Sequence, residues 1–306
     1  MKQKVCIIGF GYVGLPLACL ASKVHEVVGL DIDGKKVDLI NKKISPLNEK
    51  YTEELLKESS VIASTDFTKI QDANIIVVCV PTPIDDKQLP DLKPLIGATT
   101  SVATNMKKGQ LLIIESTIHP GTCEEVVIPL VESITQLKHG QDFHVIHCPE
   151  RIDPGNAKWT LKNIPRVIGS QSIHASQIAH DFYISFINAN FTILNSLKAA
   201  EATKIMENTF RDINIAFINE MAMSFDVLGI DIIEVIKGAS TKPFAIMPHY
   251  PGPGVGGHCI PVDPYYLIEK AKTSGFSHRF LSLAREINNS MPDYVFKIIQ
   301  TELNDI

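Results

Sequence analysis

The stretch KVCIIGFGYVG, residues 4–14, decides the fold of the first part of this chain. Its apolar beginning, residues 4–10, is typical of a strand, and the helical pattern LPLACLAS follows the stretch. Between strand and helix, Gly9, Gly11 and Gly14 form a Gly-x-Gly-x-x-Gly turn. The first two glycines permit a tight turn and the close approach of a pyrophosphate, whose charge then faces the helix N-terminus. The stretch therefore predicts a dinucleotide-binding turn.

An acidic residue follows this turn at the distance that a dinucleotide site requires. The second strand-like run, residues 27–30, ends at Asp31, about 20 residues beyond the glycines. A carboxylate there accepts hydrogen bonds from the adenosine ribose and repels a 2′-phosphate, so we predict NAD rather than NADP as the cofactor. Tyr12 and Val13, inside the turn, join the predicted cofactor contacts. A glycine turn in some other α/β protein is the alternative.

Strand-like and helix-like segments alternate through residues 1–195. The strand-like segments are VIAS, NIIVVCV, LLIIES, HVIHC and RVIGS, and the helix-like ones are DGKKVDLINKK and TEELLKES. This order predicts an α/β fold, with a Rossmann-type doubly wound parallel sheet that binds NAD over residues 1–195. In such sheets, ligands bind beyond the carboxyl ends of the strands.

Three polar stretches come directly after strand-like runs. They are Val80-Pro81-Thr82-Pro83, Glu115-Ser116-Thr117 and Pro149-Glu150-Arg151. Each has a structural alternative: the prolines end a strand, the hydroxyl residues cap a helix, and the Glu-Arg dipeptide is a surface pair. Because all three follow strands, we expect them at the ligand-binding edge of the sheet.

The sequence pattern changes from period 2 to period 3.6 after residue 194, and we place a domain boundary between residues 195 and 196. Residues 198–228 contain no Gly or Pro and carry apolar residues at helical spacing, which predicts one helix of about thirty residues. With the amphipathic segments DIIEVIKG and HRFLSLAREINNSMPDYVFKIIQTE, it predicts an all-helical domain over residues 196–306. Aromatic residues on more than one side of the long helix predict a homodimer formed through it.

Lys204, Asn208 and Arg211 share one face of this long helix. A solvated polar face is the ordinary interpretation of such a strip. Lys204 and Asn208, however, follow the last strand directly, where substrate and cofactor are expected to meet.

The stretch YPGPGVGGHCIPVD, residues 250–263, packs four glycines and three prolines around Cys259. It predicts an irregular loop, with Asp263 as the N-cap of the next helix and Pro264 at its first position. Cys259 would then lie beside a helix N-terminus, which favours the thiolate, and Asp263 would be near enough to take a proton. This pattern predicts covalent cysteine chemistry, and a buried cysteine in a Gly/Pro connector is the alternative.

The composition limits the classes of partner. The chain has 306 residues and a net charge of -5 without a long basic run, which argues against a nucleic-acid partner. Because no apolar segment reaches the length of a membrane span, we expect no membrane partner and a cytoplasmic location. Six scattered cysteines indicate reduced thiols. In FHVIHC, the side chains of His147 and Cys148 point to opposite faces of a strand, so we predict no metal site.

Several motifs, in this order, resemble those of the UDP-glucose/GDP-mannose dehydrogenase family. They are GFGYVGLPLA, VPTP, ESTIHPGT, PERIDPGNA, the Lys204-x-x-x-Asn208 helix and PGPGVGGHCIPVDP. The resemblance covers essentially the whole chain, and it is strongest to members that act on N-acetylated UDP-sugars. It implies oxidation of a C6 alcohol to a carboxylate, with two NAD consumed per UDP-sugar and no metal.

The resemblance also implies roles for individual residues. Cys259 attacks the C6 aldehyde, Asp263 handles a proton, Lys204 and Asn208 stabilise the oxyanion, and Thr117 and Glu150 position the hydrolytic water. The cofactor contacts that it implies, together with those of the glycine turn, are Gly9, Gly11, Tyr12, Val13, Gly14, Asp31, Pro81, Thr82 and Thr117. The implied substrate contacts are Glu150, Arg151, Lys204, Asn208, Gly254, Gly256 and Gly257.

One departure from the family pattern and two rival interpretations remain. Family members continue into a C-terminal domain that binds UDP, and this chain ends at Ile306 without it. A β-hydroxyacid dehydrogenase also joins a glycine turn to a Lys-x-x-x-Asn helix, although it has no use for a nucleophilic cysteine. A non-catalytic NAD-binding remnant is the second rival.

Overall fold

The computed structural model describes residues 2–85, 89–152, 156, 158–257 and 259–304. Parts of two quoted motifs, residues 153–155 and 157 of PERIDPGNA and residue 258 of the cysteine loop, lie outside this description. The chain divides into two compact units. Unit 1 comprises Met1–Pro83 and Asp91–Lys204, and unit 2 comprises Ile84–Pro90 and Ile205–Ile306. The predicted boundary between residues 195 and 196 precedes this division and stays a prediction.

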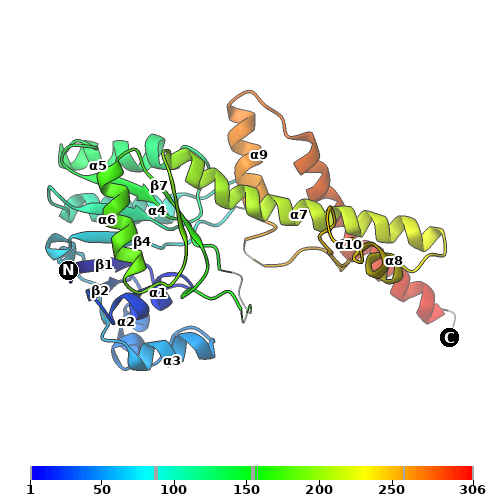
Figure 1. The fold of residues 1–306 in the computed structure, drawn as a ribbon, viewed down its shortest axis with the longest axis horizontal. Coiled ribbons are helices and arrows are strands. Elements are labelled where there is room, and N and C mark those ends of the chain that lie inside the picture. The colour runs from blue at the N-terminus through cyan, green and yellow to red at the C-terminus, as the bar shows by residue number, and fades with distance from the viewer. Residues whose placement is uncertain (1, 86–88, 153–155, 157, 258, 305–306) are drawn as a thin grey trace. The chain divides into compact units, whose positions relative to one another are not determined.

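The described part of unit 1 contains an eight-stranded sheet in the order β3-β2-β1-β4-β5-β6-β7-β8 (Figure 1). The strands are β1 (Lys4–Ile8), β2 (Glu26–Leu30), β3 (Ile62–Ser64), β4 (Ile75–Val78), β5 (Leu111–Ile114), β6 (His144–His147), β7 (Arg166–Gly169) and β8 (Phe191–Leu194). The strand order reverses direction between β1 and β4, which is the switch point at which doubly wound sheets bind their ligands. The predicted α/β class and Rossmann-type sheet are confirmed.

One step in the sheet is antiparallel. Strands β1 to β6 are paired in parallel, whereas β7 runs against β6 with His147 opposite Gly169. Strand β8 is again parallel to β7. The sequence prediction of a wholly parallel sheet is therefore wrong at this step, and β7 begins at the edge where β6 ends.

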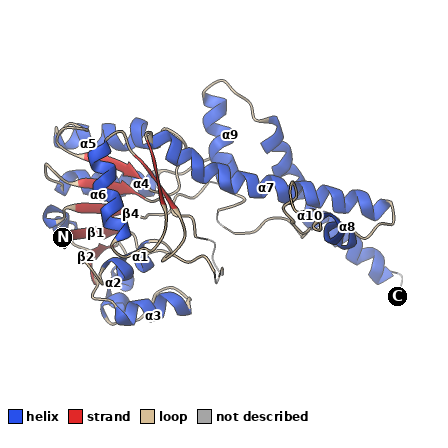
Figure 2. Cartoon of the chain, viewed as in Figure 1, coloured by secondary structure: helices blue, strands red, loops and turns tan. Residues whose placement is uncertain are grey.

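Helices cover both faces of the sheet, as Figure 2 shows. The helices of unit 1 are α1 (Gly14–Ala21), α2 (Gly34–Asn41), α3 (Lys50–Glu58), α4 (Lys93–Asn105), α5 (Ile128–Thr135) and α6 (Ile173–Ile184), with short turns η1 (Phe67–Asp72) and η2 (Cys123–Val127). Along β1 the side chains alternate: Val5 and Ile7 belong to one buried cluster with α1, α3 and α6, and Cys6 and Ile8 to another with α4 and α5. Burial on both faces explains why the strands read as continuous apolar runs.

Unit 2 is helical in its described part. Its helices are α8 (Ile232–Ala239), α9 (Asp263–Thr273), α10 (Arg279–Asn304) and most of α7 (Leu197–Val227). The long helix predicted over residues 198–228 is confirmed as α7. Polar side chains join α7 to α10: Arg285 pairs with Asp212 at 2.5 Å, and Asn219 donates to Asn288 at 2.9 Å. Among the described residues of both units, no helix has the length and apolar character needed to span a membrane.

Candidate active site

The glycine turn between β1 and α1 is tight because the chain packs against itself there. Gly9 has a φ of +95°, and a Cβ at this position would lie 2.8 Å from the carbonyl oxygen of Cys79. A Cβ on Gly14 would lie 2.0 Å from the carbonyl oxygen of Gly9. By contrast, no described atom lies within 4 Å of the Cβ that Gly11 would carry. Packing within the protein therefore requires glycine at positions 9 and 14. Beside Gly11, by contrast, there is open space of the kind that a pyrophosphate needs to approach the backbone.

Asp31 is tied to the glycine turn. It follows the last residue of β2, and its Oδ2 accepts a hydrogen bond of 2.8 Å from the N–H of Phe10. Its Oδ1 accepts from the N–H of Asp33 at 2.9 Å, and Lys36 Nζ lies 3.9 Å from Oδ2. A carboxylate offers about four lone-pair sites, so capacity remains for the two hydroxyls of a ribose. These residues fit the adenosine end of NAD.

The remaining predicted cofactor contacts lie in and beside the same turn or on the neighbouring strand ends. Thr82, in the loop after β4, donates from Oγ1 to the carbonyl oxygen of Thr117 at 2.6 Å. The loops that follow β4 and β5 are thereby joined at the switch-point edge. Tyr12 and Pro81 are exposed at the surface, and Val13 is the N-cap residue of α1.

Glu150 is buried, with 6% of its surface exposed, and its carboxylate is held by several donors. Oε1 accepts from the backbone N–H of Arg151 at 2.6 Å and of Ile152 at 2.8 Å, and Oε2 pairs with Arg166. The surface-pair alternative for Glu150-Arg151 is therefore wrong, because Glu150 binds a buried guanidinium, while Arg151 Nη1 donates to the carbonyl oxygen of Pro165 at 2.9 Å.

Arg166 and Glu115 lie beside Glu150. The sequence placed Glu115 at the ligand-binding edge without an individual role, and it did not single out Arg166. Arg166 Nη1 lies 3.2 Å from Glu115 Oε1, and both side chains are completely buried. The sequence held a signal for both residues, because each lies next to an apolar strand-like run. A charged residue in such a place is rarely buried without a partner of opposite charge, so each would be expected to pair with another charged group. Burial raises the pKa of Glu115 to about 7, with Arg166 acting against this shift and Glu150 adding to it.

In unit 2, the first turn of α9 organises the predicted cysteine site. Asn208 Nδ2 donates to Asp263 Oδ2 at 2.5 Å, and Asp263 is 3% exposed. The carbonyl oxygen of Cys259 accepts from the N–H groups of Val262 and Asp263, at 3.0 and 2.9 Å. The predicted capping is wrong in detail: Asp263 is the first helical residue rather than the N-cap, since its side chain binds Asn208. Cys259 is exposed, so the buried-cysteine alternative is also wrong.

The glycines of the cysteine loop differ from one another. Gly254 has a φ of +102°, and a Cβ there would lie 2.9 Å from the carbonyl oxygen of Asn288 in α10, so packing alone requires a glycine. Gly257 has a φ of +92°, and no described atom crowds its Cβ position or that of Gly256. Among the predicted substrate contacts of the loop, Gly256 and Gly257 thus have room for a ligand, and Gly252 has the same open space.

The predicted residues thus form two groups, one in each unit. The unit 1 group comprises Gly9, Gly11, Tyr12, Val13, Gly14, Asp31, Pro81, Thr82, Thr117, Glu150, Arg151 and Lys204, and the unit 2 group comprises Asn208, Gly254, Gly256, Gly257, Cys259 and Asp263. Lys204 is buried one helical turn before Asn208 on α7. Within the described residues, no group of three His, Cys, Asp or Glu side chains is arranged to hold a metal ion.

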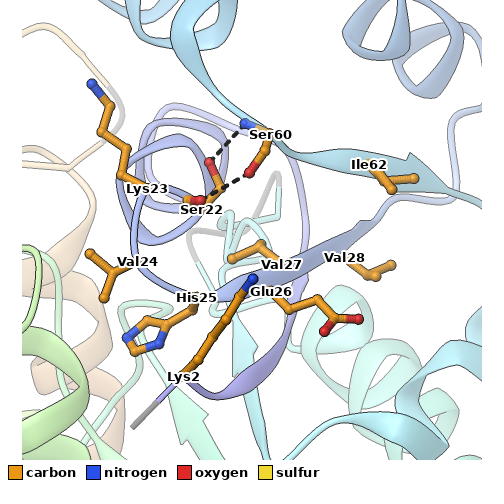
Figure 3. A pocket seen from close by; sticks show the side chains of 10 residues that line it. All are labelled: Lys2, Ser22, Lys23, Val24, His25, Glu26, Val27, Val28, Ser60 and Ile62. Carbon is orange, nitrogen blue, oxygen red and sulfur yellow. Dashed lines mark hydrogen bonds between the residues drawn. The ribbon is translucent and has the colours of Figure 1, made fainter.

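The hollow drawn in Figure 3 lies away from these residues, beside the beginning of β2. It has a volume of about 240 Å³, and Ser60 donates across it from its N–H and hydroxyl to Ser22 at 3.2 and 2.9 Å. His25 and Glu26 line it as well, and none of the predicted site residues does. Because ligands of a doubly wound sheet bind at the other ends of the strands, we assign this hollow no role in the site.

Comparison with known proteins decides between the candidate classes. Residues 3–187 match the NAD binding domain of the UDP-glucose/GDP-mannose dehydrogenase family, and residues 198–290 match the central domain of the same family. The chain belongs to the UDP-glucose/GDP-mannose dehydrogenase family. It is therefore an oxidoreductase with an NAD-binding domain, as predicted.

Two relatives show where in this family the chain lies. It is 40% identical over 292 residues to a UDP-N-acetyl-D-glucosamine 6-dehydrogenase of Pseudomonas aeruginosa, covering 95% of this chain and 69% of the relative. The structure of a UDP-D-ManNAc dehydrogenase from Pyrococcus horikoshii superimposes with a TM-score of 0.93 at 37% identity, covering 99% of this chain and 72% of the other.

A second solved structure bears on the rival class. A 3-hydroxyisobutyrate dehydrogenase of Mycobacterium tuberculosis matches with a TM-score of 0.69 at 16% identity, covering 94% of this chain and 92% of the other. At this identity the likeness shows a shared fold alone. The likeness to a β-hydroxyacid dehydrogenase is therefore one of architecture. The match to the UDP-glucose/GDP-mannose dehydrogenase family, by contrast, is a match of sequence, and it includes both the glycine turn and the cysteine loop.

Proposed function

We propose that this protein oxidises the C6 alcohol of a UDP-N-acetylhexosamine, first of all UDP-N-acetylglucosamine, to the carboxylate through a thioester on Cys259. The observation that supports this most is the exposed Cys259, whose carbonyl oxygen is bound by the first turn of α9, with buried Asp263 beside it and bound to Asn208. A four-electron oxidation needs a group that holds the aldehyde between its two halves, and a thiolate does so.

The first oxidation removes a hydride and a proton from the C6 alcohol. Asp263 takes the proton of the hydroxyl group, and the hydrogen bond from Asn208 keeps its carboxylate oriented. Lys204, a cation on α7, stabilises the negative charge that develops on the substrate oxygen. Acceptance of one hydride in each of the two oxidations is the chemistry that bound NAD supplies.

The second oxidation takes place on the adduct with the protein. The Cys259 thiolate adds to the aldehyde carbon and forms a C–S bond, and loss of the second hydride from C6 gives the thioester. Water then adds to the acyl carbon and the C–S bond breaks. One water proton goes to the sulfur, so that the thiol of Cys259 returns, and the other passes to solvent as the carboxylate is released. Thr117 and Glu150 orient this water.

The proposal extends to assembly and location. The exposed apolar side chains of α7 support a homodimer. Cys6, Cys19, Cys79, Cys123 and Cys148 are buried and are not joined in disulfides, as expected of a protein from the reducing cytoplasm.

Cys259→Ala in the full-length protein tests the proposal. We expect the variant to form no carboxylate from UDP-N-acetylglucosamine, UDP-N-acetylmannosamine, UDP-N-acetylgalactosamine or UDP-glucose, while its affinity for NAD stays unchanged. Cys19→Ala is the matched control, because burial raises the pKa of that thiol to about 11 and leaves it unreactive. Normal carboxylate production by Cys259→Ala would remove the thiol from the mechanism.

A further inference from the structure

Arg166 reaches the ligand-binding edge of the sheet because β7 is antiparallel to β6. A parallel strand begins at the far edge and ends at the site, whereas β7 begins at the site with Arg166. Continuing the register from His147 opposite Gly169 places Arg166 opposite Glu150. The antiparallel pairing of β7 with β6 therefore places the guanidinium of Arg166 beside the carboxylate of Glu150, which is proposed to orient water.

The guanidinium of Arg166 lies among four polar partners and is completely buried. Nη2 pairs with Glu150 Oε2, and Nη1 lies 3.2 Å from Glu115 Oε1 and 3.9 Å from Cys148 Sγ. Its Cζ lies 5.2 Å from the ring centre of Tyr183, whose hydroxyl donates to Glu115 Oε1 at 2.5 Å. Glu115 and Tyr183 thus fix the guanidinium on the side away from Glu150.

Stability alone does not account for this cluster. Desolvating a cation and two carboxylates costs several kcal/mol per ion, and apolar residues of similar volume often replace a buried ion pair without loss of stability. Moreover, Arg166 Nε and Glu115 Oε2 find no hydrogen-bond partner among the described residues, although both atoms are buried. A costly and incompletely bonded cluster at one edge of the sheet, where β5 and β6 end and β7 begins, is typical of a functional site.

Glu150 is the member of the cluster that the sequence predicts to position the hydrolytic water. Its carboxylate accepts two backbone N–H groups at Oε1 and Arg166 at Oε2, which fixes its rotamer. A carboxylate so held keeps a fixed position from which it can accept one further hydrogen bond, and it is therefore suited to orienting a water molecule.

We infer that Arg166 is a positioning residue for hydrolysis: it holds the Glu150 carboxylate in the orientation that aligns the water that cleaves the Cys259 thioester, and Glu115 and Tyr183 hold Arg166. This inference rests on the proposed function. In the step concerned, the water oxygen bonds to the acyl carbon and the C–S bond breaks. One water proton goes to the sulfur of Cys259, and the other passes to solvent as the carboxylate is released. Both hydride transfers come earlier and do not involve Arg166.

The test separates hydrolysis from oxidation in the full-length protein. Arg166→Lys keeps the positive charge but cannot bind Glu150 and Glu115 through two separate nitrogens of a planar guanidinium. The double variant Arg166→Gln with Glu115→Gln removes one charge of each sign, so that no uncompensated charge is left buried to prevent folding. Rapid mixing with NAD and UDP-N-acetylglucosamine follows NADH formation, and mass spectrometry of the quenched protein follows the acyl group on Cys259. Arg285→Lys, in the buried pair with Asp212 of unit 2, is the matched control.

We expect both Arg166 variants to form two NADH per active site at the wild-type rate, to accumulate acylated Cys259, and to turn over about 10²-fold more slowly, the usual cost of a misplaced reacting group. The control should lose stability without accumulating the acyl group. Equal slowing of NADH formation and turnover, or wild-type turnover in both Arg166 variants, would overturn the inference. Wild-type protein that forms fewer than two NADH per sugar would refute the proposed function, and the inference with it.

Discussion

We predict that cofactor selectivity depends on Asp31. Its carboxylate is fixed by the N–H groups of Phe10 and Asp33 beside the glycine turn, and it would repel the 2′-phosphate of a cofactor bound at that turn. We predict that NAD is preferred to NADP by at least tenfold in kcat/KM, which corresponds to about 1.4 kcal/mol. Asp31→Ser should narrow the difference, mainly by weakening NAD, and Asp38→Ser on the exposed surface of α2 should not. Equal use of both cofactors by the wild-type protein would show that the carboxylate has another role.

Glu115 makes the stability of unit 1 depend on pH. Burial raises the pKa of Glu115 to about 7 in the folded protein, above the ordinary value of 4.5, so the folded state holds more protons between these two values. The stabilisation that its protonated form allows is complete below about pH 4.5 and is lost as the pH rises through about 7, with a slope of at most about 1.4 kcal/mol per pH unit.

We therefore predict that the thermal midpoint of Glu115→Gln rises relative to that of the wild-type protein as the pH increases from 5 to 8. Thermal denaturation of both proteins across this range measures the difference. A difference that stays constant with pH would mean that Glu115 has the same charge in the folded and unfolded states throughout.

At the scale of elements, local sequence patterns predicted the helices, strands and turns whose formation depends on residues close together in the sequence. The strand–turn–helix unit around Gly9 and the whole of α7 were predicted because each has a periodic or glycine-specific pattern of its own. The direction of β7 was not predicted, because a short apolar run such as RVIG looks the same in sequence whether the strand runs parallel or antiparallel to its neighbour. The position of Arg166, and its pairing with Glu150, follow from that direction and could not be predicted either.

Helix α7 carries an apolar stripe that predicts the homodimer. Met206, Phe210 and Phe217 are exposed by 71%, 49% and 56%, and helical spacing places them within about 40° of one another. The same spacing places Asn208 about 160° around the axis from Met206, so a partner on the stripe leaves the site face of the helix uncovered. Burial of these side chains would supply the apolar centre that a stable dimer interface needs.

We predict that the wild-type protein sediments as a dimer at micromolar concentration, and that Phe210→Glu with Phe217→Glu makes it a monomer. Ile173→Glu, an equally drastic change of an exposed apolar residue on α6, is the control and should leave the dimer intact. Sedimentation velocity distinguishes the species. A wild-type monomer, or a dimer that survives the double change, would contradict the assignment of this stripe.

At the scale of the whole molecule, the predicted site residues fall into two groups, one in each unit. The sequence singled them out because glycine turns, strand ends and a Gly/Pro-rich cysteine loop are local signals, and their membership of a site stays a prediction. It did not predict the contacts within each group, such as Asn208 with Asp263, because these join residues that are 55 positions apart. The N-cap role of Asp263 was wrong for this reason, since a tertiary partner competes for its carboxylate.

The central claim is that one molecule performs two successive oxidations on the same carbon. The most direct measurement counts NADH formed per molecule of UDP-N-acetylglucosamine or UDP-N-acetylmannosamine consumed by the full-length protein, with the sugar limiting and NAD in excess. The account predicts two NADH and one uronic acid for each sugar, without release of the aldehyde. One NADH per substrate, with an aldehyde or ketone as the product, would contradict it.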